Sequence, residues 1–334
     1  MKTNKLIAGA LALIVPSTFC LTGCSFGVFN TFTYTYDNSE KYTAGDREID
    51  DKITTIDIDY VSGDVTLNGS DTDKVSVKET ANKDLDDAHK VHTWVDGSTL
   101  YVRFCESSKS INFNKINKKL ELSIPGAQEL DNLNVKISSG DLKCSGVTTG
   151  KLNANSSSGD VGISCKASDI ELKVSSGDIV LDQEGMGGSV NIKSSSGKVN
   201  YTQTGSNDQI NIKSSSGGVN ARVEKASSLV VDVSSGSITI DADDVADLNT
   251  KASSGDLDIT LGNIPQTSKI DSSSGDIKLN VPENADLTAT VKISSGSFNT
   301  KLPFSKDGKT YTCGNGSSAM DIRVSSGDVD INVI

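Results

Sequence analysis

The chain has 334 residues, a hydrophobic fraction of 35% and a formal net charge of −12 at pH 7. Its acidic balance argues against general nucleic-acid binding, which needs excess Lys and Arg to neutralise phosphates, and against simple electrostatic adsorption to anionic lipid. The length is ample for a hydrophobic core. The low hydrophobic fraction is typical of a thin, elongated fold with a large outer surface.

Residues 1–23 have the features of a lipoprotein signal peptide. Lys2 and Lys5 give it a positive start, and residues 6–15 form an apolar run too short for a stable membrane span. The letters L-T-G-C that end at Cys24 match a bacterial lipobox. We therefore expect lipidation of Cys24, export, and anchoring to the outer face of the bacterial cytoplasmic membrane, at the cell surface. The alternative is an ordinary signal peptide with an incidental cysteine.

Two segments precede the regular part of the chain. Residues 24–50 are rich in Thr, Tyr, Asn, Asp and Gly without a sustained period, which predicts a lipid-anchored tether. Residues 51–132 show alternating apolar and polar positions, less regularly, with a short helix expected at 85–91 and a hairpin turn at Asp96-Gly97. We predict a β-rich N-terminal cap and early coils over 51–132, because the end of a stacked sheet must be covered.

Residues 133–334 consist of repeats of the motif Ser-Ser-Gly-Asp, spaced 18–21 residues apart between Gly140 and Gly296. Apolar residues alternate with polar ones on both sides of each glycine, so each repeat holds two short strands with one buried face each. Glycine suits the turn between them because it reaches positive φ without a Cβ clash. The turn glycines are Gly63, Gly140, Gly159, Gly177, Gly197, Gly217, Gly236, Gly255, Gly275, Gly296 and Gly327.

A repeat of this length cannot bury its apolar face alone, so the repeats must stack. We predict an all-β fold, a parallel β-solenoid (β-helix) of about 20-residue coils, with right-handed winding as the default for parallel crossovers. Cross-sections with two and with three faces both fit the pattern. The last interval, from Gly296 to Gly327, is 31 residues long, which predicts a loop insertion around 303–319 that covers the last coil.

An aspartate follows the turn glycine in most repeats. One interpretation is a row of calcium ligands, as in glycine-rich nonapeptide β-rolls, and the other is that each aspartate caps its own turn. The motif G-G-x-G-x-D is absent and the period differs, so we favour capping and expect no metal and no cofactor. The aspartates are Asp64, Asp141, Asp160, Asp178, Asp256, Asp276 and Asp328.

Basic residues recur four places before the glycine, on the outward side of the first strand, with asparagines two places earlier. Such a face suits an anionic cell-wall polymer or a partner protein. The alternative is a solvated sheet face on which lysines discourage unwanted pairing. The basic residues are Lys136, Lys173, Lys193, Lys213, Lys251, Lys292 and Arg323. The asparagines are Asn134, Asn153, Asn191, Asn211 and Asn249.

Two weaker candidates involve histidine and cysteine. His89 and His92 lie near several aspartates, but two histidines at this spacing are weak evidence for a metal site, and a polar surface stretch is favoured. Export permits disulfides between the mature thiols. The offset of Cys144 from Cys165 on adjacent coils favours free, buried thiols, and a Cys105–Cys313 bridge stays open.

The S-S-G-D repeats, the segment I-D-I-D-Y-V-S-G-D-V at 56–65 and the segment L-E-L-S-I-P at 120–125 resemble one known family. These are the bacterial β-strand-repeat domains catalogued as putative adhesins, without an assigned activity, and the resemblance covers residues 50–334. It implies a β-solenoid on exported or membrane-associated proteins. It supplies no catalytic residues.

These observations favour a non-catalytic, lipid-anchored surface protein that acts as an adhesin-like or scaffold protein. One alternative is an envelope-sensing accessory lipoprotein that works with a membrane partner. A polysaccharide-processing β-helix enzyme is less consistent with the sequence. Sugar subsites usually stack on aromatic rings, and Tyr201 is the only aromatic residue between Gly140 and Gly296.

Overall fold

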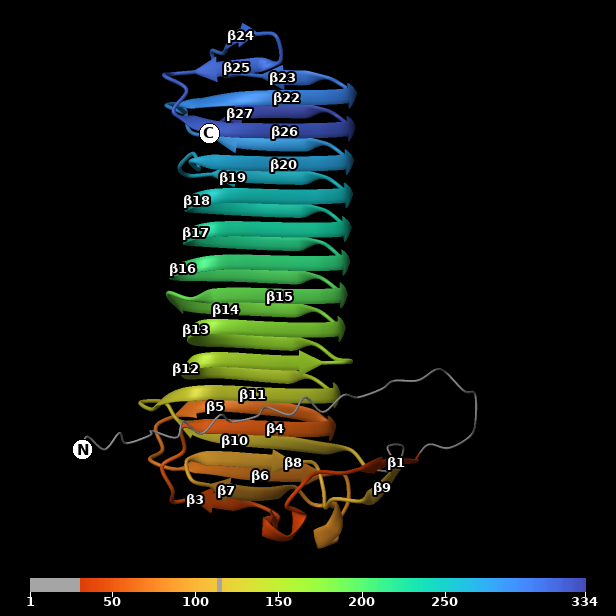
Figure 1. The fold of residues 1–334 in the computed structure, drawn as a ribbon. Coiled ribbons are helices and arrows are strands. Elements are labelled where there is room, and N and C mark those ends of the chain that lie inside the picture. The colour runs from red at the N-terminus through yellow and green to blue at the C-terminus, as the bar shows by residue number, and fades with distance from the viewer. Residues whose placement is uncertain (1–30, 113–115) are drawn as a thin grey trace, which may run out of the picture.

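The computed structural model describes residues 31–112 and 116–334, which form a rod of stacked coils (Figure 1). Each regular coil contributes one strand before its Ser-Ser-Gly corner and one after it. Each of these strands pairs in parallel with its equivalent in the next coil. The prediction of an all-β parallel solenoid is confirmed, with two main rows of strands along the rod.

The strands before the corners form the first row, which we call the pre-corner sheet. In stacking order, by their pairing registers, they are β4 (Thr55–Ser62), β11 (Glu129–Ser139), the second parts of β12 (Leu142–Ser156) and β13 (Val161–Ser176), β15 (Ser189–Ser196), the second parts of β16 (Val199–Ser216), β17 (Val219–Ser235) and β18 (Ile238–Ser254), β20 (Thr267–Ser274), β26 (Ser318–Ser326) and β22 (Leu287–Ser295).

The strands after the corners form the second row, the post-corner sheet. In stacking order they are β10 (Lys118–Pro125), β5 (Asp64–Ser70), the first parts of β12 and β13, β14 (Ile179–Met186), the first parts of β16, β17 and β18, β19 (Leu257–Leu261), β21 (Ile277–Val281), β27 (Val329–Val333) and β23 (Phe298–Thr300).

The core is a set of inward rows that run along the rod. Leu172 lies opposite Ile192, and Ile192 lies opposite Ile212, and all three side chains are fully buried. Burial of each such side chain stabilises the fold by roughly 1.5–3 kcal/mol. Because the rows are continuous, each coil supplies the hydrophobic cover that its neighbour lacks.

The C-terminal coil does not stack in sequence order. Strand β26 lies between β20 and β22, with Ile322 opposite both Ile270 and Val291, and β27 lies between β21 and β23. We expected the insertion around 303–319 to cover the last coil, which contains Val329–Val333, and that expectation was wrong. The end is formed by β22 and β23 with the antiparallel hairpin of β24 (Ser305–Asp307) and β25 (Thr310–Cys313), which pairs with β22. Because all repeats share the same alternation of apolar and polar residues, β26 can pair with both β20 and β22. The chain therefore forms the outer coil with β22 and β23, continues through the β24–β25 hairpin, and returns to form the coil between β20 and β22.

The other end of the rod is closed by antiparallel strands. Strand β6 (Val75–Ala81) covers β10, β3 (Arg47–Ile49) covers β6, and β8 (Thr99–Arg103) extends the pre-corner sheet in parallel with β4. Strand β7 (His92–Asp96) forms the expected hairpin with β8 and pairs with β2 (Thr43–Ala44). Strands β1 (Thr31–Tyr34) and β9 (Lys109–Asn112) form a separate pair at the side.

Two cap segments differ from their expected form. Residues 31–49, expected within the tether, contribute β1, β2, β3 and the 3₁₀ turn η1 (Ser39–Lys41) to the cap. The short helix expected at 85–91 is a single 3₁₀ turn, η2 (Asp87–His89). The Asp86 carboxylate accepts the His89 backbone N–H and caps this turn.

Candidate interaction surface

The corner glycines form one column along the rod. Their φ angles lie between 108° and 146°, a region that disfavours side chains. A Cβ atom on Gly177 would lie 2.1 Å from the carbonyl oxygen of Gly159, and the other stacked corners are similarly tight. Glycine is therefore required at each corner for two reasons: the backbone has a positive φ angle, and the successive coils approach too closely for a Cβ atom.

The corner aspartates cap the next coil. Asp160 Oδ1 accepts the backbone N–H of Asp178 at 2.8 Å, and Asp178 Oδ1 accepts that of Lys198 at 2.7 Å. The expectation that each aspartate caps its own turn was wrong. Parallel stacking brings the next corner's N–H within reach of the short side chain, and this bond extends the ladder through the corner. Within residues 31–112 and 116–334, no group of three or more His, Cys, Asp or Glu is placed to hold a metal ion.

The basic residues lie in one exposed column on the outer side of the pre-corner sheet. Lys173 lies opposite Lys193, which lies opposite Lys213. Asp232 and Asp271 interrupt the column further along. The whole column, in stacking order, is Lys136, Asn155, Lys173, Lys193, Lys213, Asp232, Lys251, Asp271, Arg323 and Lys292. We call this set the basic column.

Acidic neighbours compensate part of the basic column. Lys136 pairs with Asp59 at 3.1 Å and Lys173 with Glu171 at 2.5 Å. Arg323 pairs with Asp321.

Lys193 and Lys213 are adjacent basic residues of the column. In the described part of the chain, neither of these two forms an ion pair. Both line a groove of about 290 Å³ together with Asp232, which lies opposite Lys213, and serines near the corners. One strand spacing separates adjacent positions of the column, about 4.8 Å. Two like charges so close repel each other unless an anion lies nearby.

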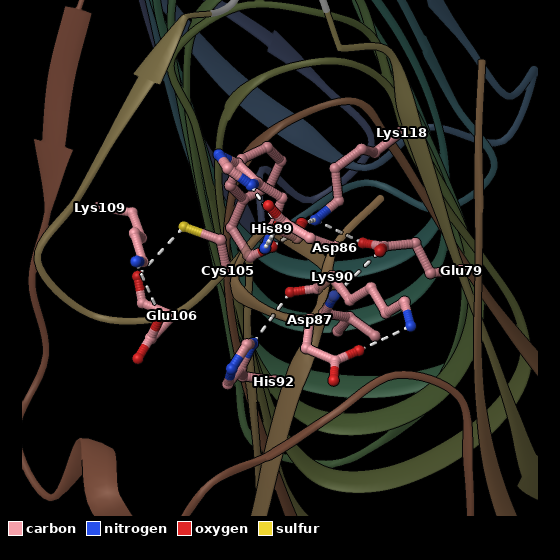
Figure 2. A network of polar contacts seen from close by, with 12 residues as sticks. Glu79, Asp86, Asp87, His89, Lys90, His92, Cys105, Glu106, Lys109 and Lys118 are labelled. Atoms are coloured by element: carbon pink, nitrogen blue, oxygen red, sulfur yellow. Dashed lines mark hydrogen bonds and ion pairs between the residues drawn. The ribbon is translucent and has the colours of Figure 1, made fainter. Parts of the chain in front are cut away.

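A connected polar cluster of the cap surrounds a buried ion pair (Figure 2). Lys118 Nζ lies 2.7 Å from Glu79 Oε1, and the two side chains are 0% and 5% exposed. The ammonium also donates to the carbonyl oxygens of His89 and Phe104, so all three of its N–H donors are used. Burial lowers the pKa of Lys118, and Glu79 opposes this effect.

Both oxygens of the Glu79 carboxylate also accept hydrogen bonds. Its Oε1 accepts the hydroxyl of Tyr60 at 2.8 Å, and its Oε2 accepts the backbone N–H of Val91 at 2.9 Å. Because no donor of Lys118 remains for a reacting group, the cluster is suited to fastening the cap to the first coil. Sequence reasoning missed it, although the signal existed. Lys118 shares the inward parity of Leu120.

The histidines do not converge on a common point (Figure 2). His89 Nδ1 contacts Asp86 Oδ1 at 2.5 Å, and His92 Nδ1 contacts the carbonyl oxygen of Lys90 at 2.9 Å. Each ring is held by a local partner. His89 is partly exposed, whereas His92 is buried, so the expected polar surface stretch is wrong for His92.

The four described cysteines are free and buried. Cys144 lies opposite Ile163 and Cys165 opposite Val147, on the two sides of a register shift, so their strands are not aligned for a bridge. Cys105 lies in the cap and Cys313 in β25 at the other end of the rod (Figure 1). Burial raises the pKa of the Cys105 and Cys165 thiols to about 12, so both are protonated and poorly nucleophilic at neutral pH.

A row of aromatic rings crosses the cap, and sequence reasoning did not assemble it. Successive ring centroids lie 5.4, 4.7, 5.6 and 5.2 Å apart in the order Tyr34, Tyr36, Tyr42, Trp94 and Tyr101. The first three rings come from the N-terminal segment and the last two from the β7–β8 hairpin. Only long-range folding brings them together.

The predicted lipidation site, Cys24, lies outside the described residues. Within the part of the chain that is described, no helix is long and apolar enough to cross a membrane.

The family described as Toastrack DUF4097 matches the chain twice, over residues 53–245 and 166–332. Among curated proteins, none matches the chain.

Three solved structures resemble the chain. A putative adhesin from Parabacteroides distasonis is 16% identical with a TM-score of 0.33, covering 90% of this chain and 100% of that one. A putative adhesin from Bacteroides fragilis is 13% identical with a TM-score of 0.30, covering 88% and 97%. A putative cell adhesion protein from Clostridium sporogenes is 8% identical with a TM-score of 0.21, covering 88% and 100%.

Proposed function

The chain belongs to the Toastrack DUF4097 family, and on this premise we propose that it is a non-catalytic, adhesin-like protein of the bacterial cell surface. In this proposal it binds an anionic cell-wall polymer through the basic column of its pre-corner sheet. The observation that carries the proposal is the register that places Lys193 beside Lys213, both exposed and without an ion-pair partner among the described residues. A regularly spaced row of cations matches a polymer with regularly spaced anionic groups.

A lipid anchor on Cys24 would hold the cap end of the rod close to the membrane. Cys24 precedes Thr31 by seven residues, at most about 25 Å of extended chain. The solenoid would then project toward the cell wall with the basic column along its side. Fractionation of cells that carry Cys24→Ala tests this part, because the protein should move from the membrane to the soluble exported fraction.

The binding proposal is tested by co-sedimentation with purified cell walls that retain their anionic polymers. We expect Lys173→Glu, Lys193→Glu and Lys213→Glu together to weaken binding at least tenfold. The matched control is Lys143→Glu, Lys166→Glu and Lys278→Glu, three exposed lysines of the post-corner sheet with the same change in net charge. The control should bind within twofold of the unmodified protein. Equal binding by the unmodified protein and both triple variants would refute the proposal.

A further inference from the structure

The outer side of the pre-corner sheet carries a mixed aromatic and polar row at its cap end. Trp94 lies opposite Tyr101, Tyr101 opposite Asp57, and Asp57 opposite Asn134. Asn153 continues the row in the next coil. The five side chains come from five consecutive strands, so they follow one another at the strand spacing of about 4.8 Å.

A groove of about 340 Å³ opens beside this row. Its lining includes Asp57, Asp59, Arg103 and Lys136, which form two ion pairs. Arg103 Nη1 lies 2.7 Å from Asp57 Oδ1, and Lys136 Nζ lies 3.1 Å from Asp59 Oδ2. The four charges therefore cancel within the protein. A groove with balanced charge suits an uncharged occupant, in contrast to the stretch around Lys193 and Lys213.

The groove also keeps hydrogen-bonding capacity for a ligand. Asn153 Nδ2 donates to Asn134 Oδ1 at 2.7 Å. This leaves the Asn134 amide N–H groups and the Asn153 carbonyl oxygen without a partner among the described residues, one a donor and the other an acceptor. Adjacent sugar hydroxyls, which both donate and accept, match such a pair.

The aromatic residues at the cap end of the row, Trp94 and Tyr101, provide apolar surface next to its polar groups. The Trp94 and Tyr101 rings stack with centroids 5.2 Å apart and an interplanar angle of 18°, and both side chains are partly exposed. Lys41 Nζ lies over the Trp94 ring, 4.7 Å from its centroid, and the Arg103 guanidinium lies over the Tyr101 ring at 5.3 Å. Their exposed parts offer apolar surface to the C–H groups of a pyranose ring, while the polar atoms beside them fix its orientation. The regular coils lack such aromatic residues on their outer face, and the cap provides them.

We propose that this row, from Trp94 to Asn153, is a binding site for an uncharged oligosaccharide. The site uses none of the unpaired lysines, so the inference goes beyond the proposed function and can fail or succeed separately from it. The bound chain would run along the rod, with one sugar against the two rings and the following sugars over Asp57, Asn134 and Asn153.

Intrinsic fluorescence tests the site directly, because Trp94 is the only tryptophan in the chain. The probes are the soluble tetrasaccharides cellotetraose, chitotetraose and maltotetraose, titrated into the folded protein. We expect at least one to cause a saturable change in Trp94 emission, with at least tenfold weaker binding after Asn134→Ala with Asn153→Ala.

The matched control is Asn200→Ala with Asn220→Ala. This pair makes the equivalent hydrogen bond, at 3.0 Å, on the post-corner sheet. The control, and the triple glutamate variant of the basic column, should bind the sugar within twofold of the unmodified protein. The proposal is overturned if no probe alters the emission, or if the Asn134 and Asn153 changes weaken binding no more than the control does.

Discussion

Asp276 and Asp328 are 52 residues apart in the chain, yet Asp276 Oδ1 accepts the backbone N–H of Asp328 at 2.8 Å. Asp328 Oδ1 in turn accepts the backbone N–H of Ser297 at 2.7 Å. The last coil of the sequence is therefore an internal level of the rod. The level formed by β22 and β23 depends on a coil that is synthesised after it.

This arrangement predicts an unusual effect of removing residues 317–334. Strand β22 would lose its parallel partner β26, and β20 would lose the neighbour on its other side. We expect backbone amides of 287–295 to exchange with deuterium far faster than in the full chain. Amides of 189–216 should keep their protection, because coils contact mainly their neighbours. Unchanged protection of 287–295 would show that β22 does not depend on β26.

The close packing of the corner glycines predicts that alanine substitution lowers the unfolding free energy much more at Gly177 than at Gly187. Gly177→Ala places a methyl group against the Gly159 carbonyl, whereas a Cβ on Gly187 meets nothing within 4 Å, and both glycines have positive φ. We expect Gly187→Ala to cost about 1–2 kcal/mol of unfolding free energy from backbone strain alone. Gly177→Ala should cost clearly more, because the next coil must shift. Urea denaturation of both variants measures the difference, and equal midpoints would mean that the corners are not close-packed.

The buried ion pair of Lys118 and Glu79 predicts that substitutions of these two residues have strongly non-additive effects on the unfolding free energy. Lys118→Met leaves the Glu79 carboxylate buried without its cation, which should lower the unfolding free energy by about 3–5 kcal/mol. The double variant Lys118→Met with Glu79→Gln should recover part of this loss, because it buries no unpaired charge. Lys225→Met breaks an exposed pair with Asp244 and should change the unfolding free energy far less, because solvent screens that pair. Additive effects of the two cap substitutions would contradict the coupling.

Several of these features were readable from the sequence. Alternation around each turn glycine was enough to predict the stacked parallel strands and the buried rows that contain Leu172 and Ile192. The same alternation places the Lys118 side chain on the inward face with that of Leu120. A search of the sequence for charged residues at inward positions would therefore have indicated the buried ion pair.

Other features depend on contacts that no local pattern records. Repeats with one shared alternation pair equally well with several neighbours, so the position of Val329–Val333 between two earlier strands was not predictable. The aspartate ladder follows from stacking, which sets the distance from Asp178 to the next coil's N–H. The ring row needs the segment around Tyr36 and Tyr42 to fold back against Trp94, a long-range contact without a motif.

The most direct test of the functional account is the affinity of the folded chain for soluble polyglycerol phosphate, measured at increasing salt. We predict saturable binding that weakens as salt screens the charges, and a loss of at least tenfold for Lys193→Glu with Lys213→Glu. The control Lys143→Glu with Lys278→Glu should stay within twofold of the unmodified chain. Binding that is insensitive to salt, or equal in both double variants, would contradict recognition of an anionic polymer by the basic column.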